Sequence, residues 1–281
     1  MTNLLKSKLL SRIGGLVTVV TCCVMFTAFV AGQESTRLTP IQREIARQRQ
    51  RLDSLEVEER RDALMRLQNL KRPEASRAAV AALNDASPTV RAAAAHAVIS
   101  LPNHEAATLL LPLLKDKIEF VRREVAFALG TARHPSAISA LVDLLNRDKQ
   151  PSVRAAAAIA LGDIGDTSAV PALTQIIAGE TSKKKKSKNA EDEFVVRSAV
   201  RSLGQIGSRA AVPALIAALE NELTSIDTRR EAATALGLLG DAAALPALNA
   251  AFQTNADPYL AEAARLAVRQ INRTKAKGAG N

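Results

Sequence analysis

The chain has 281 residues and a formal net charge of +10, with no Trp, one Tyr and six Phe. So few aromatic side chains argue against a compact enzyme or an ordinary β-sandwich, and against the stacking platforms that bind single-stranded nucleic acid. The 38 basic residues are mixed with 28 acidic ones, which is typical of solvated helix faces and not of a nucleic-acid footprint. Abundant alanine and leucine favour helix.

The N-terminal segment 1–32 has the layout of a secretory signal. A basic start precedes the apolar run 13–30, and polar chain begins at Gln33, so we predict cleavage before Gln33. The run is also close to the length of a membrane-spanning helix, and an uncleaved anchor is the alternative. The sequence thus predicts an exported protein, periplasmic or extracellular, which is either free or held at the inner membrane by its leader.

Both cysteines, Cys22 and Cys23, lie inside this apolar run. Thr21 precedes them in mid-run, which argues against a lipoprotein signal, because such a signal has its cysteine at the end of the run. The rest of the chain therefore has no disulfide, thiolate nucleophile or thiolate metal site. Removing the three basic residues of the leader lowers the formal charge from +10 to +7.

Residues 33–56 form a charged segment ahead of the regular pattern. The stretch TPIQREIARQRQRLDSLEVEE reads as an amphipathic helix, with Thr39 as its cap and Pro40 at its first position. We expect this helix to shield the first repeat or to act as a stalk.

The remaining residues, 57–272, repeat one pattern at a period of about 32 residues. VRREVAFALGTARHPSAISAL begins at Val121 and VRAAAAIALGDIGDTSAVPAL at Val153. One interval is longer, because it contains the Lys-rich insertion 181–193. The copies begin at Val57, Val90, Val121, Val153, Val195, Thr228 and Leu260.

Each copy reads as two helices. In the copy from Val153, apolar residues recur at helical spacing until GDIGD, residues 162–166, interrupts them. We expect a glycine there to end the first helix, Asp166 or Ser168 to cap the second, and Pro171 to lie in its first turn. One hairpin buries too little apolar surface to fold alone, whereas stacked copies cover one another.

The pattern D-x-x-P-x-V-R-x-A-A-A-x-A-L-G-x-I-G-D…A-V-P-A-L, read from Asp148 to Leu173, resembles the short HEAT repeat, in particular its phycobilisome-lyase-like subtype. The resemblance covers most of the chain after the leader. It implies an all-α fold, an α-solenoid of about six or seven two-helix repeats. It implies little about activity, since the family includes scaffolds, lyase subunits and a few enzymes.

Two copies depart from this pattern. Ala261 stands where the last copy should have its arginine, and Ile99 replaces the first glycine of the second copy. Degenerate first and last copies are expected of the repeats that cap a solenoid.

Charged residues recur in step with the repeat. One interpretation is a ladder of arginines that binds anions. We favour a structural role, in which each aspartate caps a helix and pairs with an arginine of its own or the adjacent repeat, because packing residues recur with the fold. The residues of this ladder are Asp85, Arg91, Asp116, Arg122, Asp148, Arg154 and Arg229.

The insertion has a block of lysines followed by a block of acidic residues. Contact with anionic lipid headgroups is one interpretation; we favour a disordered loop whose two charge blocks partly neutralise each other. The segment 273–281 is likewise expected to be a disordered basic tail. The lysines are Lys183, Lys184, Lys185, Lys186 and Lys188.

The histidines give no catalytic or metal-binding pattern. His104-Glu105 is similar to the pairs with which a HEAT-like hydroxylase family binds two irons, but Ser136 and Thr167 stand at the matching positions of the next repeats. No serine lies in a recognisable nucleophile turn. We therefore predict no catalytic residue, no metal site and no cofactor.

In HEAT solenoids the second helices line the concave side. The resemblance therefore implies a mild, partly apolar groove that would suit an extended peptide or a partner helix, unless some of its residues pack inward. The residues expected in this groove are Leu111, Val142, Asp143, Thr174, Gln175, Ile216 and Asn249.

These observations predict an exported scaffold that binds a protein partner and performs no chemistry. A lyase- or chaperone-like subunit that holds a tetrapyrrole (bilin) is an alternative, against which the missing cysteine and scarce aromatic residues count. A membrane-tethered structural component of an envelope complex is another. Nucleic acid is not an expected partner, and membrane contact would come from the N-terminal segment.

Overall fold

The computed structural model describes residues 38–181, 190–253 and 257–278, which are largely helical and contain no β-strand. The chain divides into the units 1–47 and 48–281, and helix α2 (Pro40–Arg51) crosses from one to the other. The Thr39 hydroxyl accepts the backbone N–H of Gln42 at 3.2 Å, and the Gln42 side chain accepts that of Thr39 at 2.9 Å. This capping box explains why α2 begins at Pro40.

The predicted leader lies outside the described residues. Within them, no helix combines the length and the apolar character needed to cross a membrane.

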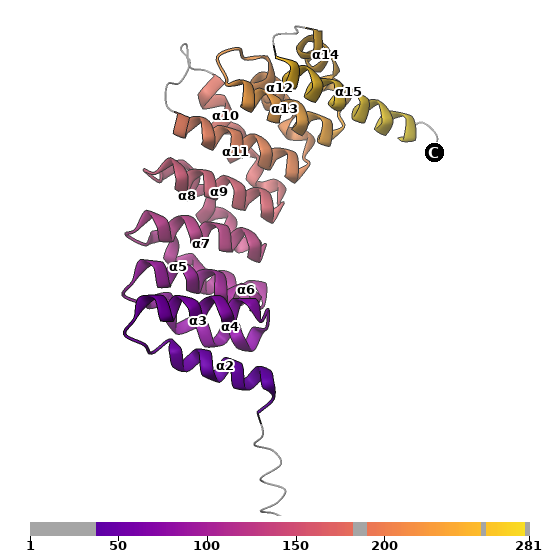
Figure 1. The fold of residues 1–281 in the computed structure, drawn as a ribbon. Coiled ribbons are helices and arrows are strands. Elements are labelled where there is room, and N and C mark those ends of the chain that lie inside the picture. The colour runs from indigo at the N-terminus through magenta and orange to yellow at the C-terminus, as the bar shows by residue number, and fades with distance from the viewer. Residues whose placement is uncertain (1–37, 182–189, 254–256, 279–281) are drawn as a thin grey trace, which may run out of the picture. The chain divides into compact units, whose positions relative to one another are not determined.

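The described residues of the second unit form six successive helix pairs and a seventh first helix (Figure 1). This series confirms the predicted all-α solenoid of HEAT-like repeats. The first helices are α3 (Val57–Asn69), α5 (Pro88–Ala97), α7 (Glu119–Ala132), α9 (Pro151–Ile164), α11 (Ala190–Ile206), α13 (Ile226–Leu239) and α15 (Pro258–Gly278). The second helices are α4 (Pro73–Ala79), α6 (Asn103–Leu110), α8 (Ile138–Arg147), α10 (Val170–Thr181), α12 (Val212–Glu220) and α14 (Leu245–Gln253).

Successive first helices pack against one another in one layer, and small residues set how close they come (Figure 1). A Cβ atom on Gly130 of α7 would lie 2.8 Å from Cα of Ala160 on α9, and one on Gly237 of α13 would lie 2.9 Å from Cα of Ala267 on α15. Both distances are too short for a real side chain, so glycine at these positions is what allows the layers to nest.

The two glycines of GDIGD have different roles. Gly165 has φ +76° and forms the C-cap of α9, as expected of a glycine that ends a helix. Gly162 lies inside α9, where a Cβ would be 2.6 Å from the Ser202 hydroxyl of α11. Asp166 then accepts the backbone N–H of Ser168 at 2.8 Å, so the aspartate is the cap that opens the second half of the repeat.

Two predicted segment boundaries differ from the structure. Helix α15 continues through Gly278, so residues 273–278 are helical where a disordered tail was expected. Helix α11 begins at Ala190, so the end of the predicted insertion is also helical. The lysines of the insertion lie in the range 182–189, outside the described residues.

Candidate functional site

The recurrent arginines and aspartates form bidentate ion pairs between successive repeats. Arg91 donates from Nε and Nη2 to the carboxylate oxygens of Asp116 at 2.8 and 3.0 Å. Arg122 binds Asp148 in the same way, at 2.7 and 3.0 Å. The side chains of Arg122 and Asp148 are only 16% and 6% exposed. The ladder therefore links adjacent repeats and offers little surface to an anion.

Each aspartate also shapes the chain before its helix. Asp148 Oδ1 accepts the backbone N–H of Gln150 at 2.9 Å, and Gln150 is itself the N-cap residue of α9. The expectation that the aspartates cap helices is therefore corrected, since they close a turn just ahead of the cap. Burial raises the pKa of Asp148, but hydrogen bonds from Arg122 and Gln150 and the charges of Arg122 and Arg154 together lower it below its usual value.

The ladder begins one repeat earlier than the sequence pattern indicated. Arg60 donates to both carboxylate oxygens of Asp85 at 2.8 and 3.0 Å, so the first copy is aligned on Glu59 and not on Val57. At the other end, Arg229 donates from Nε to the carbonyl oxygen of Leu219 at 2.8 Å.

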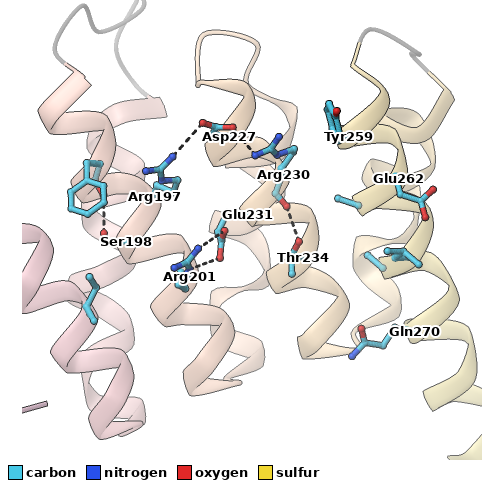
Figure 2. Close-up of a pocket in the computed structure, with 15 residues that line it drawn as sticks. Arg197, Ser198, Arg201, Asp227, Arg230, Glu231, Thr234, Tyr259, Glu262 and Gln270 are labelled. Atoms are coloured by element: carbon cyan, nitrogen blue, oxygen red, sulfur yellow. Dashed lines mark hydrogen bonds and ion pairs between the residues drawn. The ribbon is translucent and has the colours of Figure 1, made fainter. Parts of the chain in front are cut away.

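A surface hollow of about 750 Å³ lies along four successive first helices, α9, α11, α13 and α15. We call it the C-terminal hollow. Figure 2 shows the side chains from α11, α13 and α15 that surround it. Its lining residues include Phe194, Arg197, Arg201, Asp227, Arg230, Glu231, Tyr259, Glu262 and Leu266.

Ion pairs connect neighbouring helices across the C-terminal hollow (Figure 2). Arg201 of α11 donates to the carboxylate oxygens of Glu231 on α13 at 2.8 and 3.2 Å. Asp227 of α13 lies 3.3 Å from Arg197 of α11 and 2.7 Å from Arg230. The hydrogen bond and the charge of Glu231 raise the pKa of Arg201. The guanidinium groups are thus held in fixed positions by carboxylates.

Aromatic rings flank two of these arginines. The guanidinium carbon of Arg197 lies 5.6 Å from the ring centroid of Phe194, and that of Arg230 lies 5.8 Å from the ring of Tyr259 in the next repeat. Tyr259 is 71% exposed and Leu266 52% exposed. The hollow therefore presents aromatic, aliphatic and arginine side chains together, the residue types on which protein-binding surfaces most depend.

The hydroxyl groups of the hollow are bound to their own helices. Ser198 Oγ donates to the carbonyl oxygen of Phe194 at 2.8 Å, and Thr234 Oγ1 donates to that of Arg230 at 3.0 Å. Neither hydroxyl is paired with a general base, which an activated nucleophile requires. The arrangement of the described residues thus supports binding by charge and apolar contact.

The residues predicted to form a groove lie on the second half of each repeat and differ in exposure. Asp143, Gln175 and Asn249 are exposed, whereas the other four are half-buried: Leu111, Val142, Thr174 and Ile216. Leu111 and Asp143 both line a wider hollow of about 940 Å³ beside α8, and the other five are not among its described lining residues.

All three histidines lie around the junction of the second and third helix pairs. His96 Nε2 is 3.0 Å from a carboxylate oxygen of Glu124, and the rings of His104 and His134 are 6.0 Å apart. Glu105 is bound by Arg77 at 3.0 Å. In the described ranges, no three His, Cys, Asp or Glu side chains gather as metal ligands would.

A second sequence pattern that recurs with the repeat marks the C-terminal hollow, and the ladder prediction did not include it. An aromatic residue directly before the repeat origin recurs at Phe120, Phe194 and Tyr259, and an arginine two places after the origin recurs at Arg123, Arg197 and Arg230. The pattern was visible, but which of these side chains share an open surface depends on the packing of the helices.

Comparisons with known proteins agree with this architecture. The family model for HEAT repeats matches residues 46–126, 113–187 and 184–269. YibA of Escherichia coli is 20% identical with a TM-score of 0.55, over 83% of this chain and 82% of that one. No curated protein matches the chain.

Two enzyme structures are also similar. The CpcE–CpcF complex of phycocyanin lyase from Nostoc is 23% identical with a TM-score of 0.49, over 84% of this chain and 95% of that one. Human deoxyhypusine hydroxylase is 21% identical with a TM-score of 0.40, over 82% and 96%. At these identities the similarities concern the fold alone.

Proposed function

Because this chain belongs to the HEAT repeat family, we propose that it is a protein-binding scaffold whose partner docks on the C-terminal hollow. The observation that supports this proposal is the exposed combination of Tyr259, Leu266 and the ion-paired arginines of α11 and α13. Exposed aromatic and aliphatic side chains provide contact area, and arginines already held by carboxylates lose little conformational freedom when a partner binds.

Export and the absence of chemistry are parts of the same proposal. The basic and apolar leader supports export to the periplasm or beyond. The hydroxyls of Ser198 and Thr234, which are bound to backbone carbonyls, support a role in binding without catalysis. A partner in the cell envelope would fit both features.

The test is quantitative co-purification from envelope extract with the full chain. Tyr259→Ala and Leu266→Asp remove exposed side chains, so we expect a normal fold and a loss of about tenfold to 100-fold in affinity for the partner. Met65→Asp is the matched control, because Met65 is 56% exposed but lies on α3, outside the hollow. Equal recovery of the same partners by all three variants would contradict the proposal.

The hollow beside α8 is a second candidate surface, favoured by the presence of Leu111 and Asp143 in its lining. Asp143→Lys and Arg147→Ala change exposed side chains of this lining and test it in the same experiment. Partner loss in these variants, with Tyr259→Ala behaving as wild type, would place the binding site on the second helices.

A further inference from the structure

Helix α2 carries exposed arginines that have no acidic partner. Arg43, Arg47 and Arg49 are exposed, and no ion pair joins them to a carboxylate in the described part of the chain. Arg51 differs, because it lies 3.3 Å from Glu59 and 2.6 Å from Asp62. The first three guanidinium groups are thus available to an anionic surface.

Two of these arginines project from one face of α2, whereas Arg49 lies one turn after Ile45 and projects from the other side. Arg43 and Arg47 are one turn apart and share a face. Ile45, which is half-buried, and Gln48, which is only 1% exposed, lie on the opposite side of the helix. The 12 residues of α2 include four arginines and one acidic residue, Glu44, so the helix has a clear positive excess.

The position of α2 in the chain indicates which anionic surface it meets. The apolar run 13–30 is followed by residues 31–39 and then by Pro40. A linker of that length spans at most about 30 Å when fully extended. While the apolar run is in a bilayer, α2 is therefore held within reach of the lipid headgroups.

We propose that, in the chain that keeps its leader, α2 binds the anionic surface of the membrane that holds the apolar run, through Arg43 and Arg47. This surface is separate from the C-terminal hollow and would hold α2 at the bilayer whether or not a protein partner is bound. Attraction of this kind increases the bound-to-free ratio by about fivefold per arginine and weakens as salt shortens the screening length.

The chain has no tryptophan, which permits a specific test. Gln50 is exposed and lies two turns from Arg43 on the same face, so Gln50→Trp provides a single fluorescent reporter. The full chain with this substitution is reconstituted into vesicles of brominated phosphatidylcholine, with or without about 30% of the anionic lipid phosphatidylglycerol. We expect strong quenching only with the anionic lipid, and its loss in about 0.5 M salt.

Charge variants decide whether α2 itself is responsible. Replacing Arg43 and Arg47 with Gln should lower the bound-to-free ratio about 25-fold. Replacing the exposed Lys115 and Lys117 with Gln removes the same charge from another edge of the molecule and should have little effect. Equal quenching on neutral vesicles, or an equal loss in both double variants, would overturn the proposal. Protection of α2 from hydrogen exchange by an RNA oligonucleotide, but not by vesicles, would also overturn the proposal.

Discussion

At the scale of single residues, the paired Arg122 and Asp148 show how the ladder works. The arginine belongs to one repeat and the aspartate to the next, and both side chains are nearly removed from solvent. Two parallel hydrogen bonds fix their relative orientation as well as their distance. A pair of this kind contributes less through its own attraction than through the cost of leaving one partner buried alone.

Asp148→Asn therefore tests the ladder. Arg122 would keep its charge and its low exposure but lose the carboxylate, and we expect the free energy of unfolding to fall by about 1–3 kcal/mol. Urea unfolding followed by circular dichroism measures this change. Asp143→Asn is the control: Asp143 is 64% exposed and lies 3.9 Å from Arg147, so its loss should cost less than about 0.5 kcal/mol. Equal effects of the two substitutions would contradict a special role for the ladder.

The ladder also predicts a pH dependence. Burial raises the pKa values of Asp85 and Asp116, but hydrogen bonds from Arg60 and Arg91 and from the following backbone N–H outweigh it, so both values are lowered. Their contribution to stability is complete above the unfolded value of about 3.9 and is lost as the pH falls through the lower folded values, because the unfolded chain then binds more protons.

We expect the free energy of unfolding to decline between about pH 5 and pH 2.5, and to decline less steeply in Asp116→Asn. A series of urea titrations at different pH values provides both curves. Parallel curves for the variant and the wild type would mean that Asp116 has the same pKa in the folded and unfolded chain.

At the scale of helices, the glycine nine residues after the repeat origin controls the spacing of the first helices. Gly130→Ala would place a Cβ 2.8 Å from a backbone atom of α9, and we expect it to destabilise the protein by about 1–3 kcal/mol through overpacking. Gly179→Ala is the matched control, because no described atom beyond its own stretch of helix lies within 4 Å of its added Cβ and alanine favours helix by up to about 1 kcal/mol. Thermal unfolding should therefore shift in opposite directions for the two variants.

The helices themselves were predictable because their determinants are local. The period of Leu141, Leu144 and Leu145 defines the buried face of α8, and Asp166 and Gly165 mark ends that depend on neighbouring residues only. Gly162 shows the limit of this reasoning. Its role depends on a side chain of α11. Only the packed structure distinguishes a glycine that ends a helix from one that allows a neighbouring helix to approach closely.

The proposed binding surface was less predictable than the fold for a related reason. The resemblance to known solenoids implied a groove on the second helices, whereas Tyr259, the most exposed aromatic side chain among the described residues, lies on a first helix. The partners of Arg197 and Arg201 are 30 residues away in the sequence. Their pairing follows from the stacking of α11 on α13, which sequence spacing alone does not specify.

At the scale of the whole array, α15 differs from the first helices before it. Gly130, Gly162, Gly204 and Gly237 occupy one position of the repeat, and Arg269 occupies that position in α15. Arg269 is exposed, and a side chain of its length prevents a further layer from approaching as closely as the others do. Helix α15 therefore presents a charged side chain where the earlier first helices nest, as is expected of a capping repeat.

Because each repeat contacts only its neighbours, the loss of this cap should have a local effect. A chain that stops after Gln253 lacks α15 and leaves α13 uncovered at Gly237, which is buried against Ala267 of α15 in the intact protein. We expect hydrogen exchange to become about tenfold faster or more in α13 and α14, with little change in α3 and α5. Mass spectrometry of peptides from each helix resolves this gradient. A uniform loss of protection would instead mean that the ladder and the close contacts at the glycines couple all the repeats into one cooperative unit. In that case no repeat could open to bind a partner unless the others opened with it.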